Sequence, residues 1–176
     1  LALSERIGYT RGTADAYRVM SGVYLVKKDY LQSIKYKKLE LQSAQELHDS
    51  ARIAVSLYGL GDKYGAIGDI NESLQYYLES LHLNKRLGNK GDVAGLYHNI
   101  ASIYGTIGNH AEALQYYFKA LKINEEVGNK EWMAINLQHI GGYYNAHGQI
   151  DKSLKYYEAS LDITRELGNT RLMVFS

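Results

Sequence analysis

The sequence predicts an all-α fold built from repeated pairs of antiparallel helices. It repeats itself every 40 residues without an insertion, and apolar residues within each period recur at gaps of three and four. Such gaps place apolar side chains along one face of a helix. The 176 residues include 17 glycines and no proline, which suits long helices joined by tight glycine turns.

The repeat is visible as sequence columns. The motif GNK begins at Gly88 and again at Gly128, and GNT begins at Gly168. Two tyrosine columns and one leucine column keep the same spacing: Tyr24, Tyr64, Tyr104, Tyr144; Tyr36, Tyr76, Tyr116, Tyr156; Leu41, Leu81, Leu121, Leu161. We therefore expect four copies of one structural unit.

Each copy divides into two helices. In the third copy, helical periodicity runs from about residue 90 to 107 and again from 110 to 127. Gly68-Asp69 and Gly108-Asn109 separate the halves, because glycine suits the left-handed residue that ends a helix and Asp or Asn suits the N-cap of the next. These short turns predict antiparallel pairs.

The glycine-rich segment at residues 58–69 could also be a phosphate-binding loop. Such a loop would be unique in the chain and, in its Walker form, would carry Lys and Ser or Thr after the last glycine. Asp69 and Ile70 stand there instead, and the segment is one copy of the fourfold pattern. The nucleotide-binding interpretation is therefore rejected.

The pattern resembles the tetratricopeptide repeat (TPR) over nearly the whole chain. The second, third and fourth copies carry the family's alternation of large, small and aromatic residues. In the third copy these residues are Tyr97, Ile100, Ala101, Tyr104, Ala113, Tyr117 and Ala120. The first copy departs, with Lys37 and Glu40 at the last aromatic and small positions. The resemblance implies a right-handed α-solenoid, a superhelix of helix pairs. Small residues at Ser21, Gly61, Ala101 and Gly141 are expected where the two helices of a pair cross.

The expected organisation is a single solenoid segment over residues 1–176. Four full repeats occupy 9–48, 49–88, 89–128 and 129–168, with the end of a preceding repeat at 1–8 and the start of a fifth at 169–176. Because solenoid ends normally carry polar caps and these do not, we expect an excerpt of a longer array that associates end to end.

TPR proteins bind partners in the concave groove lined by the first helix of each repeat, and the resemblance implies the same face here. The candidate binding residues are mixed in chemistry: Arg18, Tyr58, Asp62, His98, Asn99, Ser102, Gln138, His139 and Asn145. Glycines at positions 22, 65, 95, 105 and 142 also fall on this face. One hypothesis is that they leave a wide groove floor; the alternative is that stacked repeats tolerate them.

His98 and His139 lie in adjacent columns of neighbouring repeats and could approach each other. A zinc site needs further ligands at suitable spacing, so we expect no metal and no cofactor. No catalytic constellation repeats or concentrates in the sequence, and we expect no enzymatic activity.

Composition gives no case for nucleic acid or membrane partners. The formal net charge is +1 and no apolar run is long enough to span a bilayer. The expected function is a protein-interaction scaffold for a peptide or helix of a partner, in bacterial signalling. The alternative is a sensory or regulatory module of a larger signalling enzyme, such as a histidine kinase, a cyclase or a transcription regulator. We expect a cytoplasmic location, or a periplasmic one if the full protein carries a signal peptide.

Overall fold

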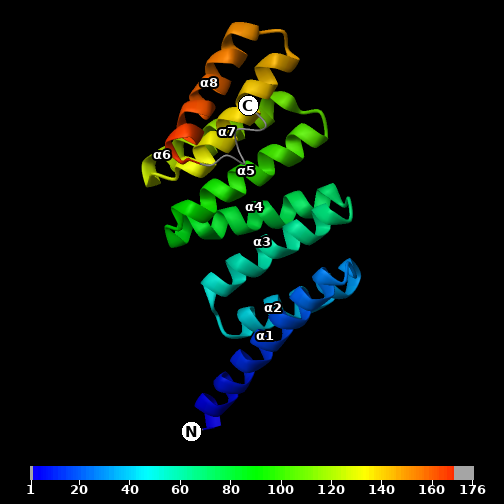
Figure 1. Cartoon of the computed structure of the whole chain (residues 1–176). Coiled ribbons are helices and arrows are strands. Elements are labelled where there is room, and N and C mark those ends of the chain that lie inside the picture. Colours follow the sequence, from blue (N-terminus) through cyan, green and yellow to red (C-terminus); the bar gives the residue numbers. More distant parts are fainter. Residues whose placement is uncertain (1, 169–176) are drawn as a thin grey trace. The chain divides into compact units, whose positions relative to one another are not determined.

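The protein is all-α, as the sequence predicts. The computed structural model describes the backbone of residues 2–168 and the side chains of residues 9–168. Over this range the chain forms eight α-helices and no strand (Figure 1). The helices are α1 Ala2–Val26, α2 Tyr30–Glu46, α3 Ser50–Ala66, α4 Ile70–Leu87, α5 Lys90–Thr106, α6 His110–Val127, α7 Lys130–Ala146 and α8 Ile150–Glu166.

The chain forms two compact units, each made of two helix pairs. Unit 1 covers residues 1–88 and contains α1–α4; unit 2 covers residues 89–176 and contains α5–α8. Within each unit, consecutive helices pack on one another, and the second helix of the first pair packs on the first helix of the next. Each unit therefore holds two of the repeats that the sequence predicts.

The turns form as the sequence predicts in three of the four repeats. Gly68, Gly108 and Gly148 take left-handed φ angles inside the repeats, as do Gly88 and Gly128 between them. Repeat 1 differs, because Lys28 (φ 59°) and His48 (φ 51°) occupy these turn positions. A left-handed conformation costs a residue with a side chain about 1–2 kcal/mol, so repeat 1 has turns that are less favourable than those of the other repeats.

Small residues lie where the helices of a pair cross. An ideal Cβ on Gly61 would lie 2.6 Å from the ring of Tyr77, and one on Gly141 would lie 3.1 Å from the ring of Tyr157. In repeat 1 the crossing is polar, since Ser21 Oγ donates to the Ser33 carbonyl at 2.9 Å and Ser33 Oγ donates to the Ser21 carbonyl at 2.8 Å. The predicted role of this column is confirmed.

The two tyrosine columns meet in every repeat. The rings of each pair stack with centroids 5.4–5.5 Å apart: Tyr24 on Tyr36, Tyr64 on Tyr76, Tyr104 on Tyr116 and Tyr144 on Tyr156. Stacked aromatic pairs add about 0.5–1.5 kcal/mol beyond their buried area. These pairs hold the turn end of each helix pair together.

One expected turn is missing. The repeat pattern places the end of a preceding helix near Gly8, but α1 continues from Ala2 to Val26 without a break. The residue aligned with the N-cap residues Asp49 and Asn129 is Tyr9, which cannot accept a capping hydrogen bond as they do. The start of the first repeat at residue 9 is therefore not marked by the backbone. The expected fifth repeat at 169–176 lies outside the described residues.

Candidate binding face

The candidate site residues lie on the first helix of each repeat: α1 and α3 in unit 1, α5 and α7 in unit 2. We call the surface formed by these helices within one unit its first-helix face. In unit 1 it carries Arg18, Tyr58 and Asp62; in unit 2 it carries His98, Asn99, Ser102, Gln138, His139 and Asn145.

In unit 2 the first-helix face contains a histidine cluster. His98 Nδ1 lies 2.9 Å from Asn136 Oδ1, and the Asn136 amide in turn donates to the Trp132 carbonyl at 2.8 Å. The His98 ring contacts those of Trp132 and His139, each with a centroid separation of 5.1 Å. The ring of Tyr117 from α6 stacks on His139 at 4.7 Å. The expected approach of His98 and His139 is therefore confirmed.

This packing keeps both imidazoles neutral at neutral pH. Burial lowers the pKa of His98 below its usual value, against the opposing effect of the hydrogen bond to Asn136. His139 keeps part of its surface exposed, but Tyr117 covers one ring face. Desolvation, followed by repulsion from His98, lowers the pKa of His139 to about 4. The cluster therefore offers aromatic and hydrogen-bonding surface without a net charge.

A tyrosine of the second helix supports the first-helix face in both units. In unit 2, the Tyr117 ring contacts the His98 ring with centroids 5.4 Å apart. In unit 1, Tyr77 Oη donates to Asp62 Oδ1 at 2.6 Å, and its ring lies 5.7 Å from that of Tyr58. Burial is the main cause that raises the pKa of both tyrosines, so each hydroxyl stays protonated and can donate.

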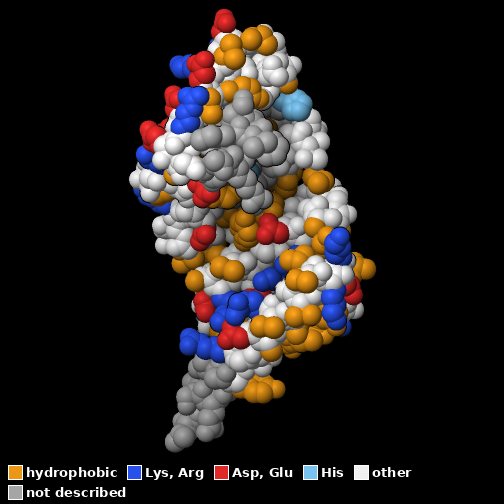
Figure 2. All heavy atoms as spheres, viewed as in Figure 1, with side chains coloured by type: hydrophobic (Ala, Val, Ile, Leu, Met, Phe, Trp, Pro, Cys, Tyr) orange, Lys and Arg blue, Asp and Glu red, His pale blue; other side chains and the backbone are white. Residues whose placement is uncertain are grey.

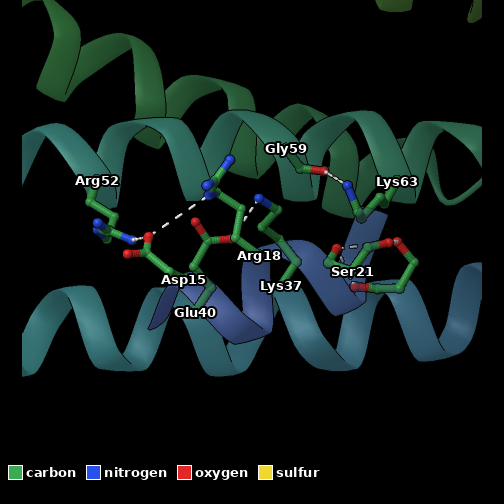
Figure 3. Close-up of polar contacts among 9 residues, drawn as sticks. Asp15, Arg18, Ser21, Lys37, Glu40, Arg52, Gly59 and Lys63 are labelled. Atoms are coloured by element: carbon green, nitrogen blue, oxygen red, sulfur yellow. Dashed lines mark hydrogen bonds and ion pairs between the residues drawn. The ribbon is translucent and has the colours of Figure 1, made fainter. Parts of the chain in front are cut away.

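The junction between the two repeats of unit 1 is ionic instead. Lys37 Nζ lies 2.7 Å from Glu40 Oε2, and both side chains are buried (Figure 3). Lys63 of α3 is also buried, and its ammonium donates to the Gly59 carbonyl at 3.4 Å. Burial, and then repulsion from Lys37, lowers the pKa of Lys63. The two departures of repeat 1 from the TPR pattern, Lys37 and Glu40, therefore compensate each other, because their opposite charges pair.

An ion pair also links α1 to α3. Arg52 Nη1 lies 2.7 Å from Asp15 Oδ1, and Arg52 Nε lies 3.8 Å from Asp49 (Figure 3 shows the bond to Asp15). These residues border a shallow hollow of about 340 Å³ that is also lined by Arg18, Glu40 and Val55. The first-helix face of unit 1 is thus charged where that of unit 2 is aromatic.

The remaining candidate residues differ in their exposure. Arg18 is exposed and lies 3.9 Å from Asp15, and Asn145 is exposed near the end of α7. Asn99 is half-buried. Gln138 Nε2 is buried and has no hydrogen-bond partner within the described part of the chain. The assignment of all nine residues to partner binding remains a prediction.

The face glycines divide into two kinds. An ideal Cβ at Gly22 or Gly95 would meet nothing within 4 Å, and one at Gly105 would meet only Ala113 at 4.0 Å. At Gly65 the Cβ would lie 3.2 Å from Ser73 Oγ, and at Gly142 it would lie 3.4 Å from Tyr157 Oη. Gly65 and Gly142 therefore face their partner helices, so only the other three fit the hypothesis of an open floor.

Sequence reasoning missed the residues that connect the candidates. Asn136 and Trp132 hold His98 from α7, and Arg52 holds Asp15 from α3. The pairing of Lys37 with Glu40 could have been found, because two departures three residues apart in one helix place opposite charges on one face.

Two further findings bear on the type of site. No group of three or more His, Cys, Asp or Glu side chains suited to a metal occurs in the part of the chain that the structure describes. Among the described helices, none is both long and apolar enough to cross a membrane.

Comparison with known families decides the classification. A tetratricopeptide repeat model matches residues 12–86 and again residues 92–166, so one match falls in each unit. The chain belongs to the tetratricopeptide repeat family. TPR proteins share a non-catalytic fold that serves protein–protein interaction, which is the class of function that the sequence predicts.

Solved structures share this TPR fold. The apo form of RapI is 18% identical, with a TM-score of 0.81 over 90% of this chain and 58% of its own. A Rap protein complexed with competence and sporulation factor is 17% identical, with a TM-score of 0.79 over 94% and 46%. A signal transduction ATPase with a tetratricopeptide repeat sensor, from Pyrococcus horikoshii, is 20% identical, with a TM-score of 0.82 over 92% and 25%. The chain therefore spans about three fifths of RapI and less of the other two. No curated protein matches the sequence.

Proposed function

We propose that this TPR chain is a scaffold that binds a peptide or helical segment of a partner protein on its first-helix face. The observation that carries the proposal is the histidine cluster of unit 2. It combines exposed surface on His139 and Trp132 with imidazoles that are neutral at neutral pH. Aromatic groups backed by hydrogen-bonding side chains are typical of the energetically dominant part of protein interfaces.

The open helix surface beside the cluster supports the same proposal. Gly95 lies one turn before His98 on α5, and a Cβ there would meet nothing within 4 Å. A partner backbone can therefore approach α5 closely at this point. The exposed hydroxyl of Ser102 offers a hydrogen bond one turn further along the same helix.

A role in signalling is favoured by the structural neighbours. One is a Rap protein complexed with competence and sporulation factor, and another is a signal transduction ATPase in which the repeats are a sensor. The second neighbour favours an alternative in which this chain is the sensory module of a longer signalling enzyme. The coding sequence on both sides of these residues separates the two, because a catalytic segment there would support the alternative.

The binding proposal can be tested with peptides selected from a phage-displayed random library against this protein. We expect the selected peptides to bind His139→Ala and Trp132→Ala at least about tenfold more weakly, as for central interface residues. His82→Ala is the matched control, because His82 is exposed on the second helix α4. Equal binding to all three variants and the unchanged protein would contradict the proposal.

A further inference from the structure

The turn between α1 and α2 carries an unusual group of exposed side chains. Two aliphatic and four basic residues lie together there, and we call the group the turn patch: Val26, Lys27, Lys28, Leu31, Lys35 and Lys38. Val26 is 85% exposed and Leu31 is 74% exposed, and all four lysines are exposed. Figure 2 shows basic and hydrophobic side chains next to one another over this end of unit 1.

The patch forms one continuous surface. Leu31, Lys35 and Lys38 are spaced by four and three residues, so they share one face of α2. Lys27 lies 5.8 Å from the ring centroid of Tyr24, and Lys35 lies 6.0 Å from that of Tyr36. Because these two rings stack on each other, they link the lysines of α1 and α2. Lys38 extends the surface to Tyr64 of α3 at 5.4 Å.

The fold does not require these residues. The six equivalent positions of repeats 2 and 3 contain no lysine: Ala66, Ile67, Gly68, Asn71, Gln75, Leu78; Thr106, Ile107, Gly108, Ala111, Gln115, Phe118. Repeat 4 has one lysine, Lys155, together with Asp151 and Glu158. Repeat 1 therefore gains exposed basic groups at positions where the same structure forms without them, whereas exposed apolar groups such as Ile67 and Ile107 also occur in repeats 2 and 3.

One lysine is retained against a backbone preference. Lys28 has a φ of 59°, whereas Gly68, Gly108 and Gly148 occupy this position in the other repeats. A strained residue of this kind is a reason to look for a function, since glycine would relieve the strain. Val26 and Leu31 are likewise more exposed than packing requires, and exposed apolar groups beside charges are typical of interaction sites.

We propose that the turn patch is a second interaction site, which binds an acidic protein segment carrying an apolar side chain. Four ammonium groups complement carboxylates, and Val26 and Leu31 cover the apolar side chain. The only carboxylate within the turn itself is that of Asp29, which caps α2 by accepting from the backbone N–H of Gln32 at 3.1 Å. Outside the turn, the carboxylate of Glu72 on α4 attracts the Lys38 ammonium electrostatically.

A protein segment fits the patch better than single-stranded nucleic acid or a membrane. Tyr24 and Tyr36 each cover one face of the other ring, and the Lys27 and Lys35 ammonium groups lie 5.8 and 6.0 Å from the ring centroids, so the two rings offer a poor platform for a stacked base. The aliphatic side chains lie on either side of a short turn that includes Asp29, unlike the continuous apolar face of a helix that inserts into a lipid surface.

The test compares two charge-neutralised variants that lose the same charge. Lys28→Gly with Lys35→Gln introduces the residues of repeats 2 and 3, and it is expected to melt at a higher temperature than the unchanged protein because the turn strain is removed. The control is Lys90→Gln with Lys130→Gln, which removes two exposed lysines of unit 2. The probe is a short fluorescein-labelled peptide in which two glutamates alternate with one leucine, measured by anisotropy at low and physiological salt.

We expect the unchanged protein to bind the probe, and the Lys28→Gly/Lys35→Gln variant to bind about fivefold or more weakly, because lost rim charges slow association. The control should stay within about twofold, which is the effect of long-range charge alone. Leu31→Asn should weaken binding of this peptide but not of one with serine in place of leucine. Equal losses in the two double variants would overturn the site. Loss of phosphatidylserine vesicle or oligo-dT binding in the patch variant, without peptide binding to the unchanged protein, would overturn the partner class.

Discussion

In unit 1, α2 presents Lys37 and Glu40 to the next repeat; at the equivalent positions of unit 2, α6 presents Tyr117 and Ala120. Lys37 pairs with Glu40 at 2.7 Å, whereas Tyr117 stacks on His139 at 4.7 Å. The position equivalent to His139 in unit 1 is Gly59, and an ideal Cβ there would lie 3.0 Å from Lys37 Cε. The Lys37 side chain therefore packs against a glycine, whereas the Tyr117 ring packs against the His139 ring.

The comparison shows that repeat junctions change by concerted substitutions. In repeat 1 the lysine in the tyrosine column is accompanied by a carboxylate at the small position one turn later, and the buried ammonium would cost several kcal/mol without that partner. The cross-helix contact changes in the same direction, from His98–Trp132 in unit 2 to Asp15–Arg52 in unit 1. The same backbone arrangement therefore presents two chemically different faces to partners.

The largest expected effect is from Glu40→Ala, which leaves Lys37 buried without its partner. Breaking a buried ion pair in this way costs about 3–5 kcal/mol of unfolding free energy. Urea denaturation followed by circular dichroism measures the loss. The matched variant is Ala120→Ser, which places in α6 the residue found at Ser80 and Ser160 and should change stability little.

The double variant Lys37→Tyr with Glu40→Ser sharpens this test. It converts the ionic junction to the residues of repeats 2 and 4, and replacing a buried ion pair by packed groups is neutral or stabilises by about 1–4 kcal/mol. A double variant as unstable as Glu40→Ala would show that the two junctions are not interchangeable.

Gly61→Ala is expected to cost about 1–3 kcal/mol, because the new methyl group would overlap the Tyr77 ring. The equivalent change in unit 2, Gly141→Ala, should cost less, since its Cβ would lie 3.1 Å rather than 2.6 Å from the ring of Tyr157. Thermal and urea unfolding of both variants measures the difference. A larger loss in Gly141→Ala would contradict the described crossings.

Acid should weaken the aromatic junction through its histidines. The folded-state pKa values of His98 and His139 lie below that of an unfolded histidine, so the unfolded chain binds more protons. The stability contributed by the neutral imidazoles is therefore present above about pH 6.5 and is lost as the pH falls toward 4.

Urea midpoints at about pH 7.5, 6 and 5 measure this effect, because these values run from above the pKa of an unfolded histidine toward the lowered pKa of the folded state. The variant His98→Gln with His139→Gln should have a flatter pH dependence, whereas His82→Gln should keep that of the unchanged protein. Identical profiles for all three proteins would refute the role of the cluster.

The smallest expected effect is from Gly95→Ala on α5. The methyl group meets nothing within 4 Å, so unfolding free energy should rise by about 0.5–1 kcal/mol from helix propensity alone. Peptides selected on this protein should bind the variant more weakly if a partner backbone approaches α5 here. Increased stability with unchanged binding would remove Gly95 from the proposed site.

Much of the fold can be predicted from the sequence, because a strict 40-residue period repeats both the core columns and the turn residues. The helix bounds near residues 90 and 110, the crossing at Gly61 and the left-handed glycines are examples. The continuous helix through Gly8 could not be predicted, because the repeat pattern places a turn there. The left-handed conformation of Lys28 could not be predicted either, because residues with a side chain disfavour it.

For the candidate site, the sequence could predict which positions share the first-helix face, but not which side chains contact one another. Column spacing indicates that His98 and His139 are close, and the structure confirms it. Spacing alone cannot show which partner each side chain selects, so the contacts of His98 with Asn136 and Trp132 had to come from the structure.

The most direct test of the account is an NMR titration of the labelled protein with a peptide selected on it. The account predicts that amide shifts concentrate on α5 and α7, around His98, Ser102 and His139. The outward residues of α6 and α8, such as Lys122 and Asp162, should change little. Shifts confined to α6 and α8, with His98 and His139 unaffected, would contradict binding on the first-helix face.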